Sequence, residues 1–437
     1  MTANNARFGS HGSRRAVRMG ALLALLAVPM GAQAAVEGES GTNFAITAKA
    51  GYISTPEGGS IYSWGYTTGS TMQLPGPTLL VTEGQTVTIT LTNALPLAGG
   101  NVSMVFPGLD VTAAGGQAGA LTREATTGGT VTYTFTASKP GTYQYHSGTR
   151  PDLQVEMGLY GAIVVTPAAP SAACAALGMS SAYDHDGSCY DRDYLFLLSE
   201  IDIDVHQLAE AQARGSTPID LGAGPFAPDY WLINGRLAPD TLAASGTDTL
   251  PTQPYGATAF MHPGDKVLAR VVGAGRDPHP FHFHGNHVRV LAQDGNMVVS
   301  AADPTKLAGP KLYTVPSTPG STVDAIFEWT GEGLGWDIYG HSSSDALEPN
   351  EWAADHGKAI PVDLPNSADM TYGGFYSGSP YLGFMGSLPP GEGGLNPNAG
   401  FTYMWHSHTE RELVNNDVFP GGMMTMMIVL PSSVDIP

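Results

Sequence analysis

Six of the 13 histidines in this chain lie in two short segments. The segments read DPHPFHFHGNH and YMWHSHT, and together they hold His279, His282, His284, His287, His406 and His408. Residues two apart in a β-strand project to the same face of a sheet, so His282 and His284 would share one face. His406 and His408 repeat this spacing. Two such strands side by side predict a nitrogen-rich metal site, since neutral imidazole binds copper, zinc, iron or nickel.

Three carboxylates follow the second histidine segment: Glu410, Glu412 and Asp417. They would accept hydrogen bonds from metal-bound imidazoles and so orient them, or they would receive an oxidisable Mn(II) or Fe(II) ion. The alternative is that they are solvated loop charges. For the histidines the alternative is an ordinary hydrogen-bonded role, and their paired spacing favours the metal site instead.

The composition around these segments is that of an all-β protein. The 437 residues include 56 Gly and 33 Pro, and only 13% are charged, which favours strands and turns over long helices. Residues 78–96 and 130–148 alternate polar and apolar side chains with the period of half-buried strands. From residue 193 the β pattern returns in DYLFLLSEIDIDV, YWLING, DKVLARVV, HVRVLAQDG, STVDAIFEW and MMTMMIVLP.

The sequence contains an internal repeat. YQYHSGT at residues 143–149 aligns with YMWHSHT at 403–409, and VFPG at 105–108 aligns with HFHG at 282–285. EGQTVTITLTNA similarly matches PGDKVLARVVGA. In this alignment His146 takes the place of His406. Two β-sandwiches related by duplication are the simplest explanation.

These patterns predict an ordered set of parts: an export signal at 1–34, a first β-sandwich domain at 35–168, a linker at 169–191, and a second domain at 192–437 with a long loop insertion at about 333–400. Cys174 and Cys189 lie in the linker and are expected to form a structural disulfide. A metal site that includes His185 is the weaker alternative. Three further histidines occur singly and receive no role: His262, His341 and His356.

Residues 1–34 have the features of a cleaved export signal. Arg14, Arg15 and Arg18 precede the apolar run MGALLALLAVPM, and AQA at 32–34 is a small-x-small cleavage site. The run is short for a transmembrane helix, and twin-arginine and general secretion both fit it. We therefore expect a periplasmic or extracellular protein. Cleavage would remove four arginines and no acids, taking the formal charge from −20 to −24, which argues against nucleic acid or an anionic membrane as a partner.

Together these residues resemble the multicopper oxidase family, whose cupredoxin domains hold a trinuclear copper centre and a separate type 1 copper. LPGPTLLVTEGQTVTITLTN is similar to the opening of the first cupredoxin domain, and HPFHFHG and YMWHSH to the two copper-binding segments. The resemblance covers nearly all of the mature chain. It implies two cupredoxin-like Greek-key β-sandwich domains, with copper as the cofactor.

The resemblance also implies roles for single residues. His279 would bind type 1 copper, and His287 is a further candidate ligand from the same segment. Five of the eight trinuclear ligands would remain: His146, His282, His284, His406 and His408.

The chain departs from the family at several ligand positions. Val105, Pro107 and Gly148 stand where three trinuclear ligands are expected, Ser407 replaces the type 1 cysteine, and Glu412 replaces the second type 1 histidine. A serine hydroxyl does not supply the thiolate of a blue copper site. In the family, electrons enter at type 1 copper and pass through that cysteine to the cluster. The usual four-electron oxidase route and type 1-dependent nitrite reduction are therefore not expected here.

The resulting hypothesis is an exported copper-binding protein and, if catalytic, a copper-dependent oxidoreductase without type 1 copper. Its partners would be a small-molecule or metal-ion reductant and O2. A non-catalytic copper-binding or assembly module is one alternative, and a zinc hydrolase with Glu410 or Glu412 as base is another. Two-domain members of the family close their clusters between the subunits of a trimer, so the resemblance also implies a homotrimer.

Overall fold

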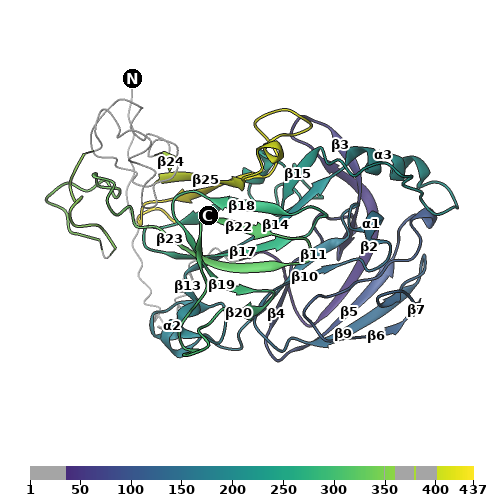
Figure 1. Cartoon of the computed structure of the whole chain (residues 1–437), viewed down its shortest axis with the longest axis horizontal. Coiled ribbons are helices and arrows are strands. Elements are labelled where there is room, and N and C mark those ends of the chain that lie inside the picture. The colour runs from purple at the N-terminus through teal and green to yellow at the C-terminus, as the bar shows by residue number, and fades with distance from the viewer. Residues whose placement is uncertain (1–35, 349, 360–377, 380–400) are drawn as a thin grey trace, which may run out of the picture. The chain divides into compact units, whose positions relative to one another are not determined.

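The computed structural model describes residues 36–348, 350–359, 378–379 and 401–437. The predicted export signal lies outside the described residues, as does most of the second half of the predicted insertion. Within the described part, no helix is long and apolar enough to cross a membrane. β-strands dominate this part, as Figure 1 shows, and the prediction of an all-β fold is confirmed.

The first module is built from two sheets, with strand orders β3-β2-β5-β9-β6 and β1-β4-β11-β10. Its strands are β1 (Glu39–Ser40), β2 (Asn43–Ser54), β3 (Ser60–Thr67), β4 (Leu79–Thr82), β5 (Thr86–Asn93), β6 (Val111–Gly115), β9 (Thr130–Thr136), β10 (Gly141–His146) and β11 (Tyr160–Thr166). A separate hairpin joins β7 (Gln117–Ala118) to β8 (Arg123–Glu124), and the short helices are η1 (Leu97–Gly99) and α1 (Pro151–Gln154).

A connecting segment follows, with α2 (Ala172–Ala176), β12 (Ser180–Ser181), η2 (Asp186–Ser188) and β13 (Cys189–Tyr190). Cys174 and Cys189 form the disulfide bond that the sequence predicts. His185 caps η2 by accepting a hydrogen bond from the Gly187 amide, so it has a structural role there.

The second module also has two sheets, with strand orders β15-β14-β17-β23-β19-β20 and β16-β26-β25-β18-β22. Its strands are β14 (Arg192–Ile201), β15 (Tyr230–Ile233), β16 (Ala259–Met261), β17 (Lys266–Gly273), β18 (His279–Phe283), β19 (Val288–Gln293), β20 (Asn296–Met297), β21 (Lys311–Leu312), β22 (Thr314–Ser317), β23 (Thr322–Glu328), β24 (Gly378–Ser379), β25 (Phe401–Ser407) and β26 (Met424–Val429). Its helices are α3 (Ile203–Gln212), η3 (Asp240–Leu242) and η5 (Glu410–Leu413).

The two modules share one topology. In the first, β2 runs parallel to β5, which runs antiparallel to β9; in the second, β14, β17 and β23 repeat these directions. The hairpin β10–β11 with parallel β4 likewise matches the hairpin β25–β26 with parallel β16. The shared strand order and directions support the duplication inferred from the sequence repeat.

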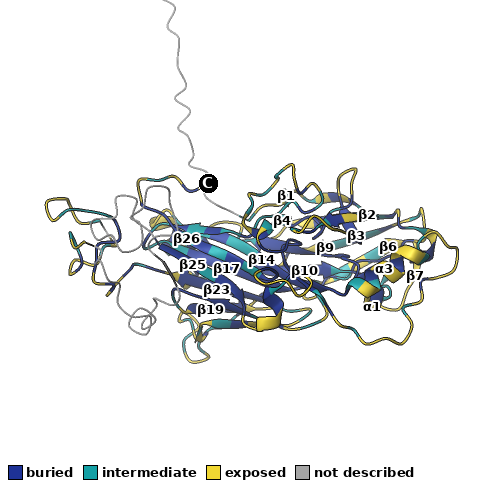
Figure 2. Ribbon diagram, turned by 90° about the horizontal axis from the view of Figure 1, so that it is seen from above, coloured by how far each residue is buried: buried dark blue, intermediate teal, exposed yellow. Residues whose placement is uncertain are grey.

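The sequence pattern of each strand follows from what covers its two faces. β5 alternates, with Val87, Ile89 and Leu91 buried in the core and threonines between them. β17 is buried along almost its whole length, because its second face packs against β10 of the first module. Figure 2 shows β17 and β23 in the dark blue of buried residues.

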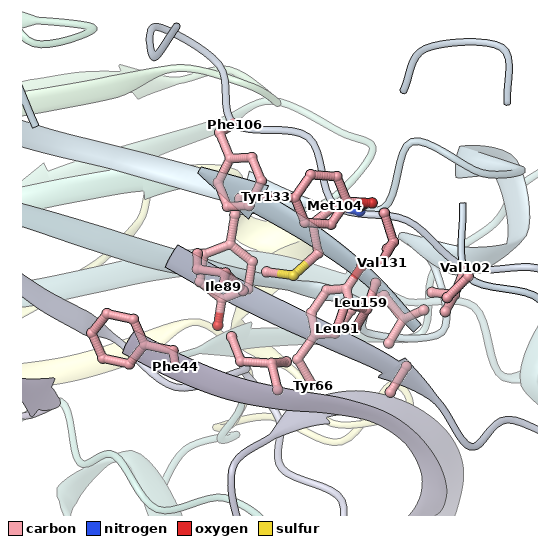
Figure 3. Close-up of a cluster of buried hydrophobic side chains, with 14 of the residues drawn as sticks. Phe44, Tyr66, Ile89, Leu91, Val102, Met104, Phe106, Val131, Tyr133 and Leu159 are labelled. Carbon is pink, nitrogen blue, oxygen red and sulfur yellow. Dashed lines mark hydrogen bonds between the residues drawn. The ribbon is translucent and has the colours of Figure 1, made fainter. Parts of the chain in front are cut away.

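Figure 3 shows part of the core of the first module, around Tyr133. The ring of Phe106 lies 5.5 Å from the ring of Tyr133 in an edge-on contact, and Met104 is fully buried beside them. Phe106 belongs to the VFPG segment that aligns with HFHG of the second module. An apolar core thus lies behind this segment, and its two potential ligand positions carry Val105 and Pro107.

One stretch differs from the sequence prediction. The β pattern of DYLFLLSEIDIDV was expected to continue to Val205, but β14 ends at Ile201 and helix α3 begins at Ile203. Asp202 caps this helix, because its carboxylate accepts hydrogen bonds from the Asp204 and Val205 amides. Asp202 is a typical N-cap residue and was the sequence signal for the start of a helix. The alternating pattern around it favoured a strand instead.

Candidate metal centre

Strands β18 and β25 bring the two histidine segments together. They are antiparallel neighbours, and His282 lies directly opposite His406 in the pair. Figure 1 shows the two strands side by side in the second module. Phe281, Phe283 and Trp405 alternate with the histidines and fill the core, with Phe283 and Trp405 ring centroids 4.8 Å apart. Core packing of these aromatic rings therefore sets the register that directs the imidazoles to the opposite face.

Three imidazoles converge on this face. The potential ligand atoms of His282, His284 and His406 all lie within 4.8 Å of one another. The Nε2 atoms of His284 and His406 are 3.0 Å apart, and the rings of His282 and His284 have centroids 4.5 Å apart. All three side chains are buried, with 4–7% of each residue exposed. The structure thus brings together three of the four histidines that the two-residue spacing pairs, His282, His284 and His406.

The environment keeps two of these imidazoles neutral. Burial, with smaller contributions from His406 and His408, lowers the pKa of His282 to about 4. Burial also lowers the pKa of His406. Neutral rings retain the nitrogen lone pairs that a metal requires. At neutral pH the cluster is therefore ready to bind a cation.

Hydrogen bonds outside the cluster orient two of the rings. The Nδ1 atom of His282 lies 2.7 Å from the Thr314 hydroxyl, and Nδ1 of His406 lies 2.6 Å from the Ser407 carbonyl oxygen. A carbonyl accepts, so Nδ1 of His406 carries the hydrogen and Nε2 is the candidate ligand atom. Such contacts fix the tautomer and the direction of a metal-binding histidine.

His408 lies at the solvent edge of the cluster. Its ring centroid is 4.8 Å from that of His282, and its side chain is 52% exposed. Nδ1 of His408 lies 3.4 Å from the carboxylate of Glu410, which is itself exposed. His408 and Glu410 therefore mark the side from which solvent reaches the three buried imidazoles.

His146 lies elsewhere within one chain. It is not part of the three-histidine group and instead lines a cavity between the modules with Gly275, Arg276 and Gly320. Burial lowers its pKa. Its backbone pairs with Val105, as His282 pairs with His406, so the structure places Val105 at the position that corresponds to a histidine ligand.

His279, which the sequence assigns to type 1 copper, instead bridges two carboxylates. Its Nε2 atom lies 2.8 Å from Glu200 and its Nδ1 atom lies 2.9 Å from Glu412. Burial alone would lower the pKa of this imidazole, but the hydrogen bonds to Glu200 and Glu412 outweigh it and raise the pKa to about 9. Both ring nitrogens therefore donate hydrogen bonds at neutral pH, and metal binding by this ring would require the loss of one of these protons.

Other sequence-derived candidates occupy different places. Glu412 accepts from His279 and not from the cluster, and His287 is exposed, with its ring 5.2 Å from that of Tyr313. Asp417 lies in an exposed turn with φ 66°. Of the three predicted outer carboxylates, only Glu410 contacts a histidine of the cluster region.

Sequence reasoning missed Glu200. This residue is the next to last of β14, in the other sheet of the module, and its other oxygen accepts hydrogen bonds from the Arg276 and Asp277 amides. Its carboxylate is fully buried against His279. The only sequence signal was an acidic residue inside the apolar run YLFLLSEI, where a charge requires a buried partner.

Ser407, which the sequence resemblance aligns with the type 1 cysteine, carries a buried hydroxyl. Ser407 is fully buried, and its hydroxyl accepts a hydrogen bond from the Thr409 amide at 3.2 Å. The doubly hydrogen-bonded His279 forms an ion-paired network with Glu200 and Glu412 in this module. The fold and the histidine cluster therefore define a cupredoxin-type protein with three candidate metal ligands on one face of a sheet.

Comparisons with known proteins give the family. Multicopper oxidase family models match residues 63–170 and 230–333, one in each module. The chain belongs to the multicopper oxidase family, whose metal is copper, in agreement with the cofactor that the sequence predicts.

Individual relatives share low sequence identity with this chain. Copper resistance protein A of Escherichia coli is 25% identical over 289 residues, which cover 60% of this chain and 44% of that protein. The chain thus spans less than half the length of the curated relatives it matches. The solved structure of multicopper oxidase mgLAC superposes with a TM-score of 0.53 at 18% identity, covering 92% of this chain and 88% of that one. The blue copper oxidase of Nitrosomonas europaea gives 0.53 at 20% identity, covering 89% and 86%. These two likenesses concern the fold.

Proposed function

We propose that this protein is an exported copper-binding member of its family and a copper-dependent oxidoreductase that works without type 1 copper. One observation carries the proposal. The ligand atoms of His282, His284 and His406 converge within 4.8 Å, while the ring at the type 1 position, His279, is held by two carboxylates. The retained cluster and the lost electron-entry site thus occur in the same module.

The chain's residues would hold copper from one side only. Three imidazoles from two adjacent strands leave coordination positions open toward the exposed His408. Bound copper would supply one-electron redox chemistry between a reductant and O2. His282 and His406 would keep their orientation through Thr314 and the Ser407 carbonyl, and the buried aromatic rings behind them would exclude water from the inner face.

The reductant would have to reach this site directly. In the family the type 1 copper receives electrons, and here its cysteine position is the fully buried Ser407. The exposed rim formed by His408 and Glu410 is the open approach, and the carboxylate favours a cationic reductant such as Mn(II) or Fe(II) over an anionic one. A zinc hydrolase is less well supported, because Glu412 is hydrogen-bonded to His279 and only Glu410 remains as a base near the cluster.

Export is part of the proposal. Its support is the charged and apolar pattern of residues 1–34 together with the disulfide between Cys174 and Cys189, a bond that persists in oxidising compartments. A homotrimer is proposed on the resemblance to two-domain members of the family. It would bring a neighbouring chain to the solvent edge of the cluster, where His408 is exposed.

The test is metal analysis and absorption spectroscopy of the purified chain after expression with copper and zinc supplied. We expect bound copper without the intense blue colour of copper-thiolate sites. His282→Ala and His406→Ala should each lose most of the copper, whereas His287→Ala, which removes an exposed histidine outside the cluster, should retain it. Oxygen uptake with a phenol, Mn(II) or Fe(II) should depend on His282 and His406. A blue protein, or zinc in preference to copper, would overturn the proposal, and copper binding without turnover would remove its oxidoreductase part.

A further inference from the structure

A second group of histidines and carboxylates lies outside the cluster on β18 and β25. It consists of Asp337, His341, Glu351 and His356, whose potential ligand atoms all lie within 4.8 Å of one another. These residues belong to the segment that follows β23. Within residues 333–348 and 350–359 of this segment, the structure describes turns and bends but no helix or strand.

The segment has two sides with different chemistry. Trp336, Ile338 and Tyr339 join the hydrophobic core of the second module. Asp337 lies between them in sequence and is buried with its carboxylate directed to the polar group. The ring of Tyr339 stacks on His341 with centroids 5.5 Å apart. Apolar packing therefore attaches the segment to the core of the second module. The four polar side chains form a separate group beside these apolar contacts.

The four side chains face one another closely. Nδ1 of His356 lies 2.6 Å from Glu351 Oε1 and 3.7 Å from Asp337 Oδ2, and Nδ1 of His341 lies 3.1 Å from Glu351 Oε2. The Glu351 side chain is only 3% exposed and that of Asp337 is fully buried. Two buried carboxylates with ligand atoms within 4.8 Å of each other repel when both are ionised, unless positive charge lies between them.

Backbone groups orient two of the four side chains, Asp337 and His356. Asp337 accepts hydrogen bonds from the Tyr339 amide at 2.8 Å and the Gly357 amide at 2.7 Å. Nε2 of His356 lies 3.1 Å from the Asp345 carbonyl oxygen, which makes Nε2 the donor and directs Nδ1 into the group. A metal-binding histidine typically donates its outer N–H to a carbonyl in this way.

The charge of the segment calls for a cation. Residues 333–359 contain five acidic side chains, Asp337, Asp345, Glu348, Glu351 and Asp355, and one basic side chain, Lys358. Lys358 pairs with Asp355 at 3.5 Å and not with the central carboxylates. His341 and His356 can supply positive charge only when they are protonated. A divalent ion would neutralise both carboxylates and would also bind the imidazole lone pairs.

We propose that Asp337, His341, Glu351 and His356 form a structural site for a divalent cation of the zinc type, separate from the copper cluster. Two imidazoles and two carboxylates are a ligand set for Zn2+, which prefers four protein ligands in tetrahedral geometry when its role is structural. The hard carboxylates disfavour Cu(I). The ion would connect Asp337 at the start of the segment to His356 near its described end and so stabilise a stretch that has no regular hydrogen-bonding pattern.

The experiment uses the full chain carrying His282→Ala and His406→Ala, so that the copper cluster does not compete. Metal-free protein is loaded with Zn2+, desalted and analysed for bound metal. We expect about one retained zinc per chain, lost when His341→Ala and His356→Ala are added. The matched control, His262→Ala in the same background, removes a single histidine outside both groups and should retain the zinc.

A second measurement reports on the segment itself. Lys358 is the one trypsin site within residues 333–359, and its side chain is 55% exposed. Zinc should slow cleavage after Lys358 by about tenfold or more, because cleavage requires local opening of the bound segment. The added histidine variants should lose this protection. The same two substitutions in the otherwise natural chain should leave copper binding at the other cluster unchanged, which shows that the protein is folded. Equal zinc retention with and without His341 and His356, or no retained zinc, would overturn the proposal.

Discussion

The Nδ1 atom of His279 lies 2.9 Å from the carboxylate of Glu412, so the two residues that the sequence resemblance aligns with type 1 copper ligands are hydrogen-bonded to each other. Glu200 completes the arrangement on the opposite side of the ring at 2.8 Å. A protonated imidazole between two carboxylates forms ion pairs with both of them and needs no metal ion to do so. This buried network lies in the same module as the buried Ser407, the residue that the resemblance aligns with the type 1 cysteine.

This network predicts a specific loss of stability at alkaline pH. The pKa of His279 is raised to about 9, from an ordinary value near 6.5. The protonated ring therefore stabilises the folded state fully below pH 6.5, and this contribution is lost as the pH rises through about 9. Its size is about 3 kcal/mol for a shift of this magnitude.

Urea unfolding of metal-free protein between pH 6 and pH 10 measures this contribution. The wild type should lose about 3 kcal/mol of unfolding free energy more than His279→Gln over this range. The glutamine variant retains a hydrogen-bonding group at this position but has no proton to release. Parallel pH profiles for the two proteins would contradict the assignment of the charge to His279.

Restoring the family's ligands at the type 1 position should restore its colour. In the double variant Ser407→Cys/Glu412→His, a thiolate would replace a buried hydroxyl and a second imidazole would replace the carboxylate that now contacts His279. We expect Cu(II) to give the intense blue absorption of a copper-thiolate site. Ser407→Cys alone should give a weaker signal, because Glu412 would still hold His279 as a protonated ring.

Thr314 should act on copper affinity without touching the metal. Its hydroxyl lies 2.7 Å from Nδ1 of His282, across the β18–β22 pair. Thr314→Val keeps the shape and removes the hydrogen bond, so we expect copper affinity to fall about 10- to 100-fold. The control is Thr322→Val, which removes a hydroxyl bonded to the Thr142 carbonyl far from the cluster and should leave the affinity unchanged. Competition with a copper chelator measures both, and equal affinities for the two variants would argue against an orienting role.

The sequence predicted those features that depend on local periodicity. The alternation in residues 78–96 and 130–148 predicted strands, and the two-residue spacing of His282 with His284 placed two imidazoles on one face, as the structure shows. The prediction was wrong where a capping residue interrupted the pattern, since Asp202 begins helix α3 inside a run that reads as a strand. Periodicity indicates which way side chains point, but it does not show where a strand ends and a helix begins.

Features that depend on tertiary contact could not be read in the same way. Glu200 and His279 are 79 residues apart, and their contact follows from the packing of one sheet against the other. His341 and His356 appeared as isolated residues because an irregular segment has no period that would place them together. Both the contact of His279 with Glu412 and the group formed by Asp337, His341, Glu351 and His356 depend on such tertiary contacts.

The junction between the two modules should depend on Arg270. This buried guanidinium lies 2.9 Å from Asp193 and 3.9 Å from Asp324, and it also donates to the hydroxyl of Thr142 in the first module. Arg270→Met would leave two buried carboxylates without a cation, at a cost of about 3 to 5 kcal/mol in unfolding free energy. Lys266→Met is the matched control, because Lys266 lies on the same strand and pairs with an exposed carboxylate at 3.7 Å.

Exposed ion pairs contribute about 1 kcal/mol or less, so the control should be nearly neutral. Neutralising the carboxylates in the triple variant Arg270→Met/Asp193→Asn/Asp324→Asn should recover most of the loss, because the penalty comes from unpaired buried charge and not from the missing side-chain volume. Chemical denaturation of the four proteins gives the comparison. If Arg270→Met and Lys266→Met cost the same, or if the triple variant is less stable than Arg270→Met alone, the buried charge cluster is not what holds this junction.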